Sequence, residues 1–182
     1  MGPTGSGKGT LEAHVLALHP EIVMPVTATT RAPRPGEINA KDYYFFTREE
    51  FERNIAEGFF IETAMYGGNY YGTPKSEVVP ALEAGNLVML EIEVQGVRQV
   101  CELIPKEDRI IVYVDVESWE ELERRVRARA PITEEELAKR KSRYEDEVSF
   151  KPQADVVICN PDGELAAAKD AFADLIQSVL SS

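Results

Sequence analysis

The chain of 182 residues is poor in the features that mark secreted and membrane-spanning proteins. Its only two cysteines, Cys101 and Cys159, lie too far apart for a disulfide framework or a cysteine metal site. Their apolar neighbours predict reduced thiols in the core. The longest apolar runs are of strand length, well short of the ~20 residues that a bilayer span needs, and no signal segment opens the chain. We therefore expect a cytoplasmic protein that contacts no membrane.

Positive charge is also scarce. Lys and Arg number 20 against 32 Asp and Glu, which gives a formal net charge of −12 at pH 7. A nucleic-acid groove needs a basic face that displaces counterions, so we expect no nucleic-acid partner, and any phosphate site must be local. An apolar share of 43% and the lack of low-complexity segments predict one globular domain spanning 1–182.

Strand and helix patterns alternate along the chain. Strands are expected at 22–30, 43–46, 59–66, 87–93, 109–116 and 154–160. Helices are expected at 10–19, 47–58, 74–85, 94–103, 118–130 and 133–148, and in the C-terminal segment. Capping boxes mark three of the helices, at Thr47…Glu50, Ser118…Glu121 and Thr133…Glu136. The nearly continuous apolar runs at 87–93 and 109–116 are typical of strands buried on both faces. This alternation predicts a parallel α/β sheet, with the Arg-, Pro- and Tyr-rich stretch at about 27–82 inserted as a lobe.

The opening, MGPTGSGKGT, contains a phosphate loop. Gly2, Gly7 and Lys8 match G-x-x-x-x-G-K, in which glycines let backbone N–H groups approach phosphate oxygens and the lysine reaches the β- and γ-phosphates. Gly9 stands where Ser or Thr normally offers a hydroxyl to Mg²⁺, but Thr10 follows, and Mg²⁺ keeps several waters. The alternative is a plain Gly-rich turn before a helix. The predicted ATP-binding residues here are Gly2, Pro3, Thr4, Gly5, Ser6, Gly7, Lys8, Gly9 and Thr10.

A second candidate phosphate site lies in TATTRAPRPGE. Arg31 and Arg34 are three residues apart in a loop stiffened by Pro33 and Pro35, which lowers the entropic cost of aiming two guanidinium groups at one phosphate. Taken alone, the same spacing also fits a solvated basic loop.

Together with KDYYFF, FIE and GGNYYGT, this loop resembles the monophosphate-binding lobe of guanylate kinases. The resemblance runs from the phosphate loop to VVICN, and so covers nearly the whole chain. It implies a P-loop NTPase-type parallel sheet flanked by helices (core 1–26 and 83–182), a GMP-binding lobe at about 27–82 and a helical lid at about 125–145. It also implies transfer of the γ-phosphoryl group of ATP to GMP with Mg²⁺. The sequence leaves a monomer and a homo-oligomer both open.

The resemblance assigns residues on the acceptor side. Arg31, Arg34, Tyr43 and Tyr71 would hold the GMP phosphate, Glu62 and Thr73 the guanine, and Thr27 and Glu93 would assist. Asn160 would meet ATP, and Glu91 or Glu93 would approach the metal, with Glu91 and Thr10 the expected Mg²⁺ ligands. Chemistry supports Glu62 independently, since guanine presents N1–H and its 2-amino group side by side to one carboxylate. Adenine has an acceptor at N1, so it would leave the carboxylate unpaired.

Arginines in ELERRVRARAPITEEELAKR match the lid of guanylate kinases. Arg125, Arg129 and Arg140 are expected to join Lys8 as catalytic residues, because phosphoryl transfer needs positive charge on the equatorial oxygens. Arg129 is followed by Ala130 instead of the family's usual glycine. The alternative is that these arginines only pair with neighbouring glutamates, which is the interpretation we adopt for Arg124 and Arg127.

Guanylate kinases also have an apolar strand before the phosphate loop, at the centre of the sheet. Here only Met1 precedes Gly2, so we expect a chain clipped at its front, with neighbouring backbone groups left unpaired. Five buried apolar side chains are worth about 10 kcal/mol, against a total domain stability of about 5–15 kcal/mol. Three alternatives to a GMP kinase stay open: a non-catalytic interaction module, a kinase for another small phosphate ester, and an inert fragment.

Overall fold

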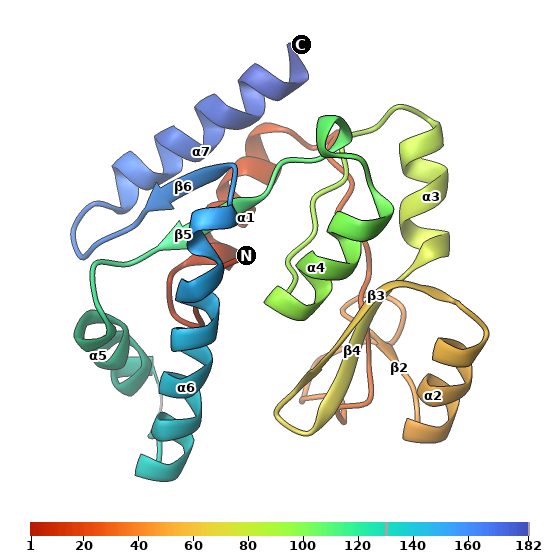
Figure 1. Cartoon of the computed structure of the whole chain (residues 1–182), viewed down its shortest axis with the longest axis horizontal. Helices are drawn as coiled ribbons and strands as arrows, with labels where there is room; N and C mark the ends of the chain where they lie inside the picture. Colours follow the sequence, from red (N-terminus) through yellow and green to blue (C-terminus); the bar gives the residue numbers. More distant parts are fainter. Residues whose placement is uncertain (130, 182) are drawn as a thin grey trace. The chain divides into compact units, whose positions relative to one another are not determined.

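The computed structural model describes residues 1–129 and 131–181, except for the side chain of Arg129. The chain divides into two compact units. The first comprises Met1–Pro20 and the described residues from Lys106 onward, and the second comprises Glu21–Pro105. The predicted lobe at 27–82 falls inside the second unit. Seven α-helices and six strands occur among the described residues, which makes the fold α/β (Figure 1).

The first unit is built on a parallel pair of strands. Its elements are α1 (Lys8–Leu18), η1 (Lys106–Asp108), β5 (Val112–Asp115), α5 (Trp119–Arg129), α6 (Glu134–Phe150), η2 (Lys151–Gln153), β6 (Val156–Cys159) and α7 (Leu165–Leu180). Strands β5 and β6 pair in parallel from Val112↔Val156 to Asp115↔Cys159. Helix α7 contacts both α1 and β6 (Figure 1). A buried apolar cluster of this unit joins Val116 and Trp119 to Leu137 of α6, and Tyr144 packs against the cluster.

The second unit contains a four-stranded sheet and three helices among its described residues. Its elements are β1 (Ala28–Thr29), β2 (Tyr44–Phe45), α2 (Arg48–Ala56), β3 (Phe60–Tyr66), β4 (Asn69–Pro74), α3 (Lys75–Glu83) and α4 (Val94–Leu103). The strand order is β2-β1-β4-β3, parallel between β1 and β2 and antiparallel elsewhere. Gly67 and Gly68, with φ of 58° and 82°, form the turn of the β3–β4 hairpin, where positive φ favours glycine. Phe51 stacks on Phe60 at 4.4 Å between ring centroids in the core.

Two of the three predicted capping boxes are confirmed in full, and one of the two hydrogen bonds of the third is present. Thr47 and Thr133 each form a reciprocal capping box with the glutamate three residues later. The Ser118 hydroxyl accepts a hydrogen bond from the Glu121 N–H at 3.3 Å. No helix among the described residues has the length and apolar character required to cross a membrane.

Two expectations about strands and the core are wrong. The apolar run 87–93 forms only one parallel bridge, Val23↔Val88, and its residues are half-buried or exposed. An apolar composition allows a strand, but a ladder also needs a neighbour to continue it, and among the described residues Val23 pairs with this run at a single position. Cys159 is exposed instead of buried, because alternate residues of β6 face opposite sides and only Ile158 is covered. Both cysteines are free, as expected.

Met1 pairs with backbone groups that we expected to be unpaired. Its terminal ammonium donates to the carbonyl oxygen of Val112 at 2.9 Å. The N–H of Val114 in turn donates to the carbonyl oxygen of Met1 at 2.9 Å. The residue before the phosphate loop therefore lies beside β5 and fixes the start of the loop.

Candidate functional site

The phosphate loop is held tightly against β5. Gly2, Gly5 and Gly7 have φ of 135°, 100° and 95°, a region that only glycine adopts freely. A Cβ at Gly2 would collide with the carbonyl oxygen of Val114, and a Cβ at Gly7 would collide with Nδ2 of Asn160. The loop therefore requires glycine at these positions both for its conformation and for its close packing. It ends at the N-terminus of α1, where backbone N–H groups favour anions.

Asn160 connects the loop to both strands of the parallel pair. It is 4% exposed, and its Nδ2 donates to the carbonyl oxygen of Ser6 at 2.7 Å. Its backbone N–H donates to the carbonyl oxygen of Asp115 at 2.9 Å. The end of β6 is thereby joined to the end of β5 and to the middle of the loop.

Lys8 lies over the loop that it follows. Its Nζ donates to the carbonyl oxygens of Gly2 at 2.6 Å and Pro3 at 3.2 Å. Thr10 is an exposed residue in the first turn of α1. The loop therefore presents backbone N–H groups, one ammonium group and one hydroxyl, which suit a polyphosphate.

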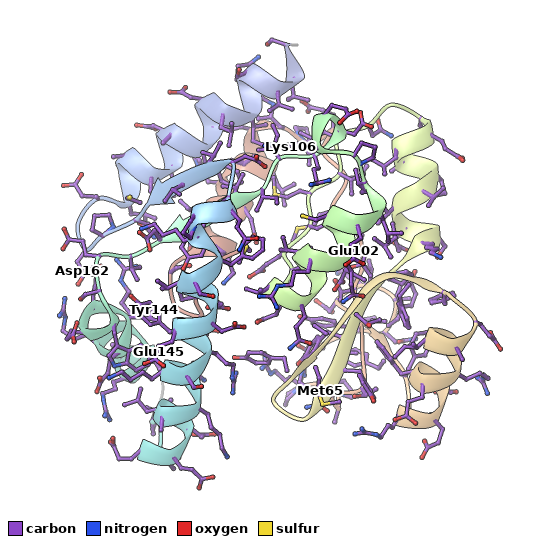
Figure 2. All side chains as sticks on the ribbon, in the orientation of Figure 1. Met65, Glu102, Lys106, Tyr144, Glu145 and Asp162 are labelled. Carbon is purple, nitrogen blue, oxygen red and sulfur yellow. The ribbon has the colours of Figure 1, made fainter. Side chains whose placement is uncertain are left out.

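Arg125 of α5 is tied to the same loop region through Asn160. Its guanidinium donates to the Asn160 carbonyl oxygen at 2.7 Å, to Glu121 at 2.5 Å and to Asp162 at 2.9 Å. Asp162, labelled in Figure 2, lies in the turn between β6 and α7. Arg125 first, and then Arg124, hold the pKa of Asp162 below its usual value by hydrogen bonding.

The other lid arginines are placed differently. Arg129 ends α5, and its side chain and Ala130 lie outside the described residues. Arg140 is half-buried on α6 and forms no ion pair with the described residues. Arg124 pairs with Asp162, and Arg127 pairs with Glu123 and Glu134, in agreement with the structural role expected for these two arginines.

In the second unit, β3 and β4 bring Glu62 and Thr73 together. Glu62 is 3% exposed and Thr73 1%, and the Thr73 hydroxyl donates to Oε1 of Glu62 at 2.7 Å. Burial raises the pKa of Glu62, because a carboxylate loses its water there. A Cβ at Gly96 of α4 would collide with Oε2 of the same carboxylate. The absence of a side chain at Gly96 therefore leaves the space that Oε2 occupies.

Helix α4 is held against the edge strand β3 by two glutamines that the sequence analysis did not single out. Gln99 accepts a hydrogen bond from Thr63 N–H at 3.0 Å and donates to Thr63 O at 2.7 Å. Gln95 accepts one from Met65 N–H at 3.4 Å. The signal available in the sequence was a pair of glutamines four residues apart on the helix that follows the apolar run 87–93.

The Arg31 loop brings together most of the predicted phosphate ligands of this unit. The Arg31 guanidinium lies 5.3 Å from the centroid of the Tyr43 ring, and the Tyr43 and Tyr71 rings are 6.3 Å apart. Arg31 also forms a two-pronged ion pair with Glu37, at 2.9 and 2.8 Å. Arg34 lies exposed in the same turn. Glu37 was not among the predicted site residues, although it is the last residue of the segment TATTRAPRPGE that contains Arg31 and Arg34.

The remaining predicted residues are less confined. Thr27 is half-buried, and its carbonyl oxygen accepts a hydrogen bond from Tyr44 N–H at 3.0 Å. Glu91 is exposed, and Glu93 is the N-cap of α4. Among the described residues, no group of three His, Cys, Asp or Glu side chains could hold a metal ion by itself.

The glycine loop with its lysine, set at the end of a parallel strand pair and leading into a helix, defines a P-loop protein of the α/β class. Residues 1–178 match the family model described as Guanylate kinase. A guanylate kinase of Trichormus variabilis is 45% identical to this chain, and the match covers 91% of this chain and 82% of the relative. A guanylate kinase of Rubrobacter xylanophilus is 46% identical, with 91% of this chain and 85% of the relative covered. The crystal structure of guanylate kinase from Anaplasma phagocytophilum aligns with a TM-score of 0.76 at 30% identity, over 97% of this chain and 82% of that one. The chain belongs to the guanylate kinase family, whose members are ATP:GMP phosphotransferases.

Proposed function

We propose that this protein transfers the γ-phosphoryl group of ATP to GMP, giving ADP and GDP, with the residues described above in the following roles. The phosphates of ATP bind the backbone N–H groups of residues 2–10, and Lys8 exchanges its loop carbonyl partners for the β- and γ-phosphates. Asn160 holds the loop and borders the ATP site. Residues 27–82 form the GMP-binding lobe and residues 125–145 the lid.

Recognition of GMP rests on two chemistries within the second unit. Arg31, Arg34, Tyr43 and Tyr71 bind its phosphate as charged and hydroxyl donors. Glu62 accepts hydrogen bonds from guanine N1–H and the 2-amino group, and Thr73 orients the carboxylate by its bond to Oε1. Thr27 and Glu93 border the same ligand. The observation that carries the proposal is the buried Glu62 carboxylate. Thr73 donates to it in the structure, and a ligand with two further N–H donors would offset more of the cost of burying its charge.

Mg²⁺ would accompany ATP, and the oxygen donors present suit it. Mg²⁺ takes hard oxygen ligands and keeps several waters, so most of its shell would be phosphate oxygens and water. In the first unit the Thr10 hydroxyl would be the protein ligand, and in the second unit Glu91 or Glu93 offers a carboxylate of the same ligand class. The ion supplies positive charge to the β- and γ-phosphates. Arg125, Arg129 and Arg140 add positive charge around the transferred group.

The test is a comparison of ADP release with GMP, AMP, CMP and UMP as acceptors. We expect a rate with GMP at least 100-fold above that with AMP, because AMP offers Glu62 a lone pair where GMP offers N–H groups. Equal rates with GMP and AMP would refute the assignment. Glu62→Gln should remove most of the activity, whereas a kinase for a base-free phosphate ester would be unaffected by that change.

A further inference from the structure

Glu37 holds a place in the Arg31 loop that the proposed reaction does not use. We propose that Glu37 is a positioning residue, which fixes the Arg31 guanidinium so that one edge of it is ready for the phosphate of the acceptor nucleotide. The inference rests on the proposed function and adds a residue to it. Glu37 itself would not touch GMP.

The contacts of Arg31 determine which of its donors are used. Nη1 donates to Oε2 of Glu37 at 2.9 Å and to the carbonyl oxygen of Ala32 at 2.8 Å, and Nη2 donates to Oε1 of Glu37 at 2.8 Å. These bonds use three of the five guanidinium N–H groups. The bonds to Glu37 and Ala32 do not involve Nε–H or the second Nη2–H, which point in parallel from one edge of the plane toward the side where Tyr71, another predicted phosphate ligand, also acts on Arg31. Two parallel N–H groups match two oxygens of a phosphate.

Aromatic rings hold the plane of the Arg31 guanidinium, in addition to the bonds that Glu37 makes with its two Nη atoms. It lies 5.3 Å from the Tyr43 ring centroid and 5.8 Å from that of Phe45. The side chains of Arg31 and Glu37 are 16% and 18% exposed, so the pair is largely shielded from water. Hydrogen bonding to Glu37 is the largest influence on the pKa of Arg31 and raises it. Burial lowers the pKa, and the charge of Glu37, followed by the charge and hydroxyl of Tyr71, raises it further. The ion pair therefore orients the cation and leaves its charge in place.

Glu37 also fixes the backbone that carries the second arginine. Its Oε2 accepts a hydrogen bond from Arg34 N–H at 2.6 Å, and Glu37 N–H donates to the Arg34 carbonyl oxygen at 3.0 Å. One carboxylate thus ties the side chain of Arg31 to the turn at Arg34. An arginine ordered before the ligand arrives loses less rotamer entropy on binding, which strengthens phosphate binding without a new contact.

A competing role makes the opposite prediction. If Glu37 acted as an internal anion that occupies Arg31 until GMP displaces it, neutralising Glu37 would tighten GMP binding. If Glu37 served only the folding of the lobe, its loss would weaken binding of the base and of the phosphate alike. These three roles separate in kinetic constants.

The experiment uses Glu37→Gln and Glu37→Asp, with Glu83→Gln at the exposed end of α3 as the matched control. The measurements are kcat, the KM for GMP and for ATP, the inhibition constant of guanosine, which lacks the phosphate, and the urea midpoint of unfolding. We expect Glu37→Gln to raise the KM for GMP about tenfold, which is about 1.4 kcal/mol, with the KM for ATP and the guanosine constant unchanged. Glu37→Asp, which keeps the charge, should recover part of the loss.

An unchanged or lowered KM for GMP in Glu37→Gln would overturn the proposal, and a lowered one would identify a competing anion. An equal rise in the guanosine constant, or unfolding of both variants, would assign Glu37 to the fold and also overturn it. Failure of the unaltered protein to phosphorylate GMP would instead contradict the proposed function, so the two failures are distinguishable.

Discussion

Replacing Gly96 with alanine tests whether the space beside Glu62 is required for guanine recognition. The added Cβ would collide with Oε2 of Glu62 and would lie 3.0 Å from its Cδ and 3.3 Å from Cβ of Ile92. Glu62 has little room to retreat, because it is 3% exposed and its other oxygen is bonded to Thr73. Helix α4 is also constrained, since Gln99 is bonded to both backbone groups of Thr63.

The size of the effect follows from the bonds that the carboxylate makes. Hydrogen bonds to a charged group contribute about 1.5–3 kcal/mol each, and guanine makes two of them with Glu62 under the proposed function. A carboxylate turned away from guanine loses the equivalent of at least one strong bond, about 3 kcal/mol, which is about 100-fold in kcat/KM. Alanine is favoured over glycine inside a helix by up to about 1 kcal/mol, and this gain partly offsets the clash in stability.

The assay compares kcat/KM for GMP, the KM for ATP and the urea midpoint of unfolding in Gly96→Ala. The control is Glu102→Ala, which changes an exposed side chain of the same helix (Figure 2). We expect a loss of about 100-fold with GMP, little change with ATP and a folded protein. A folded Gly96→Ala variant with undiminished kcat/KM for GMP would refute the link between Gly96 and base recognition.

Three further predictions concern other parts of the molecule. Asn160→Asp places a carboxylate oxygen against the Ser6 carbonyl oxygen and removes a buried hydrogen bond worth about 1–3 kcal/mol. In steady-state kinetics the KM for ATP should rise about tenfold and the KM for GMP should stay unchanged, whereas equal rises in both would contradict this role of Asn160. Burial raises the pKa of Glu62 above 4.5, so kcat/KM for GMP should fall as the pH drops through the raised pKa and the carboxylate becomes protonated. The contribution of Glu62 to folding stability should decrease as the pH rises from 4.5 through the raised pKa, because the folded state holds the proton more tightly than the unfolded state. If the pH–rate profile of Glu62→Gln shows the same fall at low pH, Glu62 is not its source. Thr47→Ala removes the capping box of α2 and should lower the free energy of unfolding by about 1 kcal/mol, as measured by urea titration, without changing kcat. An unchanged urea midpoint of unfolding would show that the capping box does not stabilise the protein.

Features set by nearby residues could be predicted from the sequence. The helix starts at Thr47 and Thr133 depend on a hydroxyl and a glutamate within four positions, and both boxes form. Strand β4 was not among the expected strands, although its local signal, two glycines at positive φ in the turn that precedes it, was present in the sequence. Such signals act over one turn of chain, so tertiary contacts have little power to override them.

Pairing between distant segments could not be predicted in the same way. The run 87–93 has the composition of a buried strand, yet it pairs with Val23 at one position only. Composition reports what a segment can bury, whereas a ladder depends on which backbone lies beside it. The exposed Cys159 has the same cause, since an apolar neighbourhood in sequence says nothing about which face of β6 is covered.

The residues of the candidate site fall into the same two groups, those predicted from the sequence and those found only from their contacts. Motif spacing predicted Lys8, and the resemblance to guanylate kinases predicted Arg31 and Glu62; these three assignments stay predictions. The residues that hold them, Glu37 and Gly96, came only from contacts. A glutamate in an acidic chain and a glycine inside a helix carry no functional signal in isolation, because their role is defined by the side chain that they meet.

Asn160 shows how one residue of this supporting kind can couple two functional parts of the first unit. Its side chain donates to the Ser6 carbonyl oxygen in the phosphate loop, and its own carbonyl oxygen accepts from the Arg125 guanidinium. A shift of the loop that changes the position of Asn160 therefore changes the bond that Arg125 makes. Since Arg125 also binds Glu121 and Asp162, any such shift alters how its charge is shared among three oxygen partners. Under the proposed function, phosphate binding in the loop would therefore act on Arg125 through Asn160. Because these partners of Asn160 all lie in the first unit, Asn160→Asp is expected to act on ATP and leave GMP unaffected.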